Sequence, residues 1–191
     1  MSLLWPVLVG LALAVALGGK LQRLARLRLR GLWLFYLGLG VRIVAFPFGF
    51  LPWHTPGSIG KPLWLASYAI LVLGVAVNAR IPGVAIVFVG MASNVAAVLA
   101  NGGRMPALPS ALHAAGKHFI VSRNSELAVH PHLAWLIDRW AAPRWVPLAN
   151  VFSVGDVIIS LGAIVFALVA TGAIDRFVPP RLRRTAVAPA G

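Results

Sequence analysis

Five long apolar stretches follow one another along this chain, at residues 3–18, 31–51, 62–78, 81–101 and 147–172. A helix needs about 20 mostly apolar residues to cross the roughly 30 Å hydrocarbon core of a bilayer. Of the 191 residues, 60% are hydrophobic and only 11% are charged, which is about half the charged share of an ordinary soluble domain. The sequence therefore predicts an all-α fold, a polytopic membrane bundle of about five transmembrane helices.

These stretches leave little room for a separate domain. We expect one bundle over residues 1–175, an external loop at 102–146, and a basic cytoplasmic tail at 176–191. Within the loop, apolar residues recur at the spacing of one helical face, at Leu133, Leu136, Ile137 and Trp140. This pattern predicts a short amphipathic helix over residues 132–141, lying on the outer leaflet with Asp138 turned away from the apolar side.

The basic residues suggest how the chain is oriented. There are 17 Lys and Arg against 4 Asp and Glu, and five basic residues between Lys20 and Arg30 directly follow the first apolar stretch. Such clusters stay on the cytoplasmic side and contact anionic lipids, so they indicate membrane lipids rather than nucleic acid as partners. We expect a multi-pass protein of a bacterial plasma membrane, with its N-terminus outside and its C-terminus in the cytoplasm.

Asp156 is an acid within an apolar stretch, where an ionisable group is costly and usually functional. A structural alternative exists, because Ser153-x-x-Asp156 is the pattern of a capping box at a helix start. Arg42 lies at a similar depth in the second stretch, so it is predicted to pair with Asp156 or else to bind an anionic substrate or a lipid phosphate. Asn94 is a further polar residue of this region and is typical of contacts between membrane helices.

A second polar cluster follows the fourth stretch, and its members are Asn101, Gly102, Gly103, Arg104 and Pro106. It is either part of a binding site or simply a capped helix end. No metal or cofactor is expected, because the chain has no Cys and His130-Pro-His132, even with help from Glu126, has a poor spacing for chelation.

The segment from Leu136 to Gly162, LID…VPLANVFSVGDVIISLG, resembles the C-terminal third of bacterial lipoprotein signal peptidase (signal peptidase II). The resemblance implies that Asp138 and Asp156 form an aspartyl pair and that Asn101 matches the Asn at the outer end of the preceding span. Ser153 stands where that family has Asn. The whole chain is more similar to a family of small bacterial integral membrane proteins known only as a domain of unknown function, through Asn-Gly-Gly-x-Met-Pro and Phe-Ser-x-Gly-Asp.

Two neighbouring carboxylates cannot both ionise cheaply, so one would hold a proton as the acid while the other activates water. The first hypothesis is therefore an aspartic hydrolase-like membrane protein that acts on a lipid-anchored or membrane-inserted substrate. The second is a non-catalytic scaffold or accessory subunit that docks a partner in a larger membrane complex. The third is a small transporter or a lipid-binding protein.

Overall fold

The computed structural model describes residues 4–45, 55–116, 125–127, 130–147 and 150–175, and the chain is mostly helical. Each of the five apolar stretches contains one long helix, as the sequence predicts. These helices are α1 (Leu4–Ala16), α2 (Leu32–Ala45), α3 (Gly57–Ala76), α4 (Val84–Ala100) and α6 (Val154–Ala170).

The helix bounds differ from the predicted stretches. α6 begins at Val154 rather than at 147, because Val151 and Phe152 form a short strand and Ser153 caps the helix. α3 begins earlier than expected, at Gly57, and includes Pro62. Residues 46–51 of the second stretch lie outside the described residues. By length and composition, α3 alone among the described helices could cross a membrane, and the other four are apolar but have only 13 to 17 residues.

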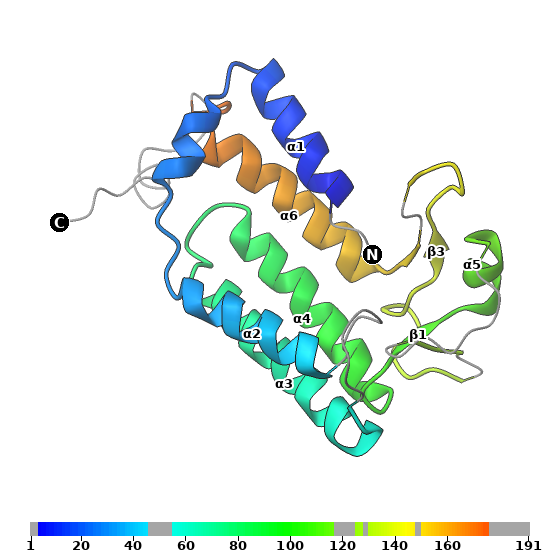
Figure 1. The fold of residues 1–191 in the computed structure, drawn as a ribbon. Coiled ribbons are helices and arrows are strands. Elements are labelled where there is room, and N and C mark those ends of the chain that lie inside the picture. Colours follow the sequence, from blue (N-terminus) through cyan, green and yellow to red (C-terminus); the bar gives the residue numbers. More distant parts are fainter. Residues whose placement is uncertain (1–3, 46–54, 117–124, 128–129, 148–149, 176–191) are drawn as a thin grey trace.

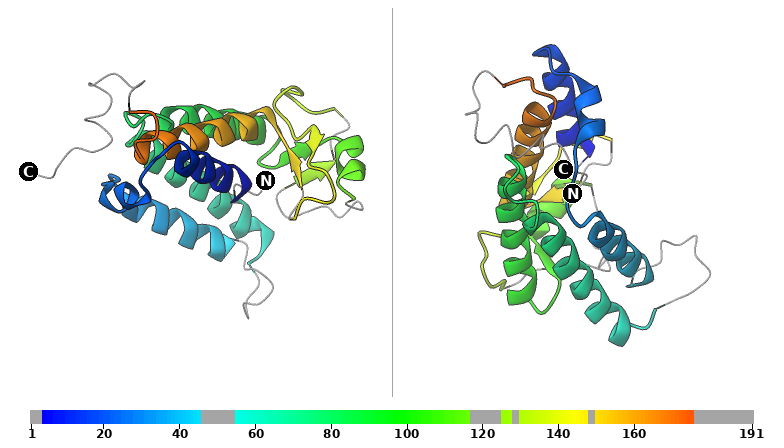
Figure 2. Two further views of the ribbon diagram at one scale, coloured as in Figure 1. Left: turned by 90° about the horizontal axis from the view of Figure 1, so that it is seen from above. Right: turned by 90° about the vertical axis from the view of Figure 1, so that its left-hand side faces the viewer.

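The helices form a curved row (Figures 1 and 2). α6 packs between α1 and α4, and α3 packs between α4 and α2. Small residues allow the closest of these contacts: a Cβ atom placed on Gly162 would lie 2.7 Å from the backbone nitrogen of Val87, and one placed on Gly90 would lie 2.6 Å from the carbonyl oxygen of Gly155. α4 and α6 therefore approach backbone to backbone, which brings their polar side chains within reach of each other.

A small irregular region caps one end of the row (Figure 1). It contains two pairs of short strands, β1 (Met105–Ala107) parallel to β2 (Ser125–Leu127) and β3 (Trp140–Ala141) antiparallel to β4 (Val151–Phe152), together with the short helix α5 (Pro109–Ala114). An isolated bridge between Ala107 and Asp138 connects the two pairs. Because β4 leads directly into α6, this region is held at the start of α6.

The predicted amphipathic helix over residues 132–141 is not formed. The segment is a series of turns followed by β3, and Leu133 has a positive φ of 51°. Its backbone bonds to neighbouring segments: the Asp138 N–H donates to the Pro106 carbonyl (3.0 Å) and the Arg139 N–H to the Phe152 carbonyl (3.2 Å). The apolar side chains do not share one face either, since Leu136 and Ile137 are buried and Leu133 and Trp140 are exposed.

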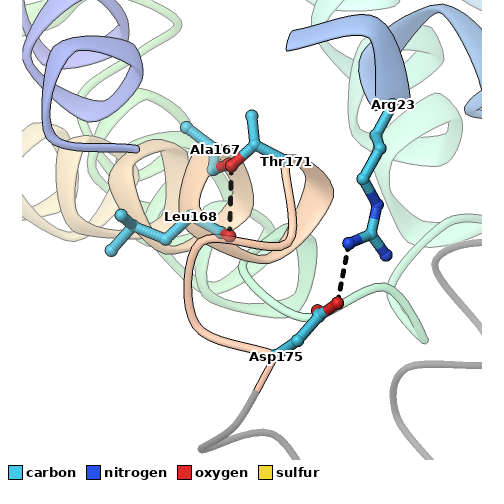
Figure 3. Close-up of polar contacts among 5 residues, drawn as sticks. All are labelled: Arg23, Ala167, Leu168, Thr171 and Asp175. Carbon is cyan, nitrogen blue, oxygen red and sulfur yellow. Dashed lines mark hydrogen bonds and ion pairs between the residues drawn. The ribbon is translucent and has the colours of Figure 1, made fainter. Parts of the chain in front are cut away.

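At the opposite end of the row, the 3-10 helix η1 (Leu21–Arg26) is tied to the end of α6. Arg23 forms an ion pair with Asp175 (Nη1 to Oδ2, 2.7 Å), beside Thr171, whose hydroxyl donates to the Ala167 carbonyl (Figure 3). The Lys20 N–H also donates to the Thr171 carbonyl, 2.9 Å away. The basic connection after α1 and the end of α6 therefore lie together, away from the strands.

Candidate functional site

Asp156 lies in the first turn of α6 and closes a capping box with Ser153. The Asp156 N–H donates to the Ser153 hydroxyl, and the Ser153 N–H donates to Oδ2 of Asp156, each at 3.1 Å. These bonds satisfy two backbone donors that a helix start leaves free, and the carboxylate faces the positive end of the helix. The structural alternative for this motif is therefore confirmed, and the capping box fixes where the carboxylate lies.

Asn94 connects this capping box to α4. Its amide nitrogen donates to Oδ1 of Asp156 (3.0 Å), and its amide oxygen accepts a hydrogen bond from the Ser153 hydroxyl (2.8 Å). Asn94 and Ser153 are both buried. Asn94 thus serves as a contact between helices, as predicted. It also makes Asp156 a carboxylate with a hydrogen-bond donor on each oxygen.

Asp138 lies in the segment that precedes β3, near enough to the triad of Asn94, Ser153 and Asp156 for the charge of Asp156 to act on it. The residue is only 8% exposed, and its backbone bonds on both sides to the chain around β1, at Pro106 and Leu108. Burial raises the pKa of Asp138 from 3.8 to about 7, and the negative charge of Asp156 contributes to the rise. Asp138 is therefore a buried carboxyl rather than a solvated surface carboxylate.

The two arginines that follow Asp138 in the sequence, Arg139 and Arg144, contact other groups. The Arg139 guanidinium lies over the Trp140 ring, 5.5 Å from its centroid. Arg144 donates to the carbonyl oxygens of His113 and Ala114 at the end of α5. Both side chains therefore help to hold the irregular region together.

Asn101 has a role that its place in the sequence does not reveal. It lies directly after α4, and its side chain pairs with the backbone of His132: Oδ1 accepts from the His132 N–H (2.9 Å) and Nδ2 donates to the His132 carbonyl (2.9 Å). The same amide nitrogen also donates to the Ala97 carbonyl. Asn101 therefore fastens the segment that carries Asp138 to the end of α4. A single amide side chain gives no sequence signal for such a long-range contact.

The other members of the Asn101 cluster build the turn that leaves α4. Gly102 and Gly103 have φ values of 67° and 86°, a backbone conformation that favours glycine, and Gly103 lies under the Lys61 side chain. Arg104 is half-buried. Pro106 is buried in β1, where its carbonyl accepts the bond from Asp138. This cluster therefore positions Asp138 through the backbone.

The predicted ion pair between Arg42 and Asp156 is not formed. Arg42 lies on α2, which packs against α3, whereas Asp156 lies on α6, which packs against α4 and α1. The Arg42 guanidinium lies over the Tyr68 ring, 5.1 Å from the ring centroid. Arg42 and Asp156 were predicted to pair because they lie at similar depths within their own apolar stretches. The position of a residue along its own helix gives no information about which helices are neighbours.

The described histidines do not form a metal site with one another or with the described acids. Within the described part of the chain, no three His, Asp or Glu residues are placed to hold a metal ion. His118 and the side chain of Glu126 lie outside the described residues.

The fold and site define a mostly helical protein with a carboxylate-bearing polar cluster at one end of a row of apolar helices. Residues 26–168 match the family of unknown function DUF5317, so the chain belongs to that family. No curated protein and no solved structure shows significant similarity to the chain.

Proposed function

We propose that this protein is an integral membrane hydrolase of the aspartic type, with Asp138 and Asp156 as its acid and base. The observation that carries the proposal is the environment of Asp138: a buried carboxyl whose pKa is raised to about 7, partly by the charge of Asp156. Pairs of carboxyl groups with such different environments are typical of acid and base partners. The resemblance of this segment to signal peptidase II supports the same roles.

Membrane placement is supported by where the apolar side chains lie. Large hydrophobic residues are exposed along all five long helices, among them Leu13 on α1, Leu39 on α2, Leu73 on α3, Leu99 on α4 and Leu161 on α6. α3 has the required length, yet only 28% of its apolar window is buried, unlike the core helix of a soluble protein. Such exposed apolar surfaces on a curved row of helices support contact with the hydrocarbon of a bilayer.

The same arrangement supports the proposed orientation in the membrane. The basic residues that surround η1 lie at one end of the row, with the end of α6, and the carboxylate site lies at the other end. With the basic end in the cytoplasm, the N-terminus and the carboxylates are outside. The site then lies at the outer leaflet of a bacterial plasma membrane, where it meets membrane-anchored substrates.

Before the reaction the two carboxyl groups share one proton, which is on Asp138, and Asp156 is ionised. Asp138 donates its proton to the substrate carbonyl oxygen, while Asp156 accepts a proton from the attacking water. The hydroxyl adds to the carbonyl carbon and forms a tetrahedral diol. Asp156 then gives its proton to the leaving group as that bond breaks, and Asp138 recovers its proton from the diol. Each Asp156 oxygen has a second lone pair, so the bonds from Asn94 and Ser153 leave room for the water.

A second function is supported by the bonds of Asp156 themselves. Both of its oxygens accept hydrogen bonds from within the protein, and through Asn94 they connect α4 with α6. This arrangement suits a non-catalytic membrane scaffold or an accessory subunit, in which the triad only holds helices together.

One assay separates the two functions. Purified full-length protein in vesicles is incubated with a fluorescence-quenched peptide that carries an acyl anchor, and release of fluorescence is measured. Asp138→Asn and Asp156→Asn are expected to abolish the release, and Asp175→Asn, which changes an acid at the far end of the row, is expected to retain it. No release by the wild type, or equal release by Asp138→Asn, would support the scaffold.

A further inference from the structure

An apolar groove runs between α3 and α4, well apart from the contact between α4 and α6. Its volume is about 400 Å³, within the range of small-molecule sites. The residues that line it include Leu65, Tyr68, Val72 and Ala76 on α3, and Val95 and Leu99 on α4. Leu99 is 60% exposed, so the groove is open to the surroundings of the protein.

The shape of the groove fits one extended hydrocarbon chain. From Leu65 to Ala76 it follows α3 over twelve residues, and the rise of an α-helix between the first and the last is about 16 Å. That length is about half of the roughly 30 Å hydrocarbon core.

A positive charge lies at one end of this groove. The Arg42 guanidinium stacks on Tyr68, which is among the first lining residues of α3. The first acidic residue of the chain is Glu126, so α2, α3 and α4 contain no Asp or Glu that could neutralise Arg42. A half-buried guanidinium in apolar surroundings favours an anion such as a phosphate, with which it forms two parallel hydrogen bonds.

We propose that this groove binds one anionic phospholipid, with an acyl chain along α3 and the phosphate on Arg42. The charge at one end and the apolar lining beyond it match the two parts of such a lipid. A helix of a partner protein or of a second copy would fill the groove but would not account for Arg42. The proposal rests on the membrane placement proposed above and is independent of the hydrolase reaction.

Native mass spectrometry of the full-length protein tests this site. The protein is purified in mild detergent, and vesicles of phosphatidylglycerol or of phosphatidylcholine supply the probe. The wild type is expected to retain one phosphatidylglycerol at least tenfold more than phosphatidylcholine. Arg42→Gln should abolish the preference, and Ala69→Trp, which fills the groove, should remove both lipids. Arg26→Gln changes an exposed arginine outside the groove and should behave as the wild type.

Several results would overturn the proposal: equal retention of the two lipids by the wild type, an unchanged preference in Arg42→Gln, or a protein dimer in place of bound lipid. Circular dichroism establishes that each variant is folded. Alkaline extraction of membranes is run on the same material. Extraction into the soluble fraction would reject the membrane placement itself, whereas retention in the membrane without a bound lipid would reject only this site.

Discussion

The side-chain amide of Asn94 on α4 donates a hydrogen bond to Oδ1 of Asp156 on α6, across 3.0 Å. This contact joins residues 62 positions apart in the chain, and Ser153 closes the triangle by donating to the Asn94 oxygen. The carboxylate that the sequence places at a helix start is therefore held from a second helix, and its charge acts on the buried Asp138.

Asn94→Ala is expected to lower the free energy of unfolding by about 1–3 kcal/mol, because it removes a hydrogen-bond partner from the buried Ser153 hydroxyl and from the half-buried Asp156 carboxylate. Thermal unfolding in detergent, followed by circular dichroism, measures the change. Ser93→Ala is the matched control, since the buried Ser93 hydroxyl has no hydrogen-bond partner among the described residues and its removal should cost little. Equal losses in the two variants would contradict the importance of the triad.

Asp138 is expected to make stability depend on pH. Its pKa in the folded protein, about 7, is above the ordinary value of 3.8, so the folded state binds this proton more tightly than the unfolded state. Its contribution to stability is therefore complete below about pH 4 and is lost as the pH rises through about 7. The full loss is on the order of 4 kcal/mol, from about three pKa units.

Asp138→Asn removes this dependence. Relative to the wild type, the variant should gain stability between pH 4.5 and pH 8, which melting temperatures at the two pH values measure. Asp175→Asn, at the opposite end of the row, provides the comparison. A difference between Asp138→Asn and wild type that stays the same at both pH values would show that the Asp138 carboxyl keeps an ordinary pKa.

Gly162→Ala should separate α4 from α6. The added methyl group would lie 2.7 Å from the backbone nitrogen of Val87, too close for a carbon atom, so the helices must move apart. We expect a loss of about 1–3 kcal/mol in the free energy of unfolding. Gly40→Ala on α2 meets no atom within 4 Å and should instead stabilise its helix by about 0.5–1 kcal/mol. A change in the free energy of unfolding with the same sign in both variants would argue against the close contact between α4 and α6.

Asn101→Ala should release the segment that leads to Asp138. With its side-chain partner removed, the His132 N–H is expected to exchange with deuterium at least several-fold faster in hydrogen-exchange mass spectrometry. The Arg30 N–H bonds to the Asn78 side chain at the other end of the row and serves as an internal control. Unchanged exchange at His132 would mean that other contacts hold this segment.

Apolar patterning was sufficient to find the helices, because a run of apolar residues long enough for a helix is visible locally. The local motif Ser-x-x-Asp was likewise sufficient to identify Ser153 and Asp156 as a capping box, since both partners belong to one helical turn. The same local reasoning failed for residues 132–141. The spacing of their apolar residues fits a helix, but their backbone instead forms hydrogen bonds to Pro106 and Phe152. These partners lie elsewhere in the chain, so the segment's own sequence does not reveal them.

The sequence by itself determined a mostly helical chain and which of its few polar residues stand out. Only the tertiary structure decided which of them meet. Neighbouring helices α4 and α6 bring Asn94 to Asp156, whereas Arg42, on α2, which is separated from α6 by α3 and α4, lies on Tyr68. The physical reason is that periodicity specifies which face of a helix is apolar, while close packing of small residues such as Gly90 and Gly162 selects the helix that covers it.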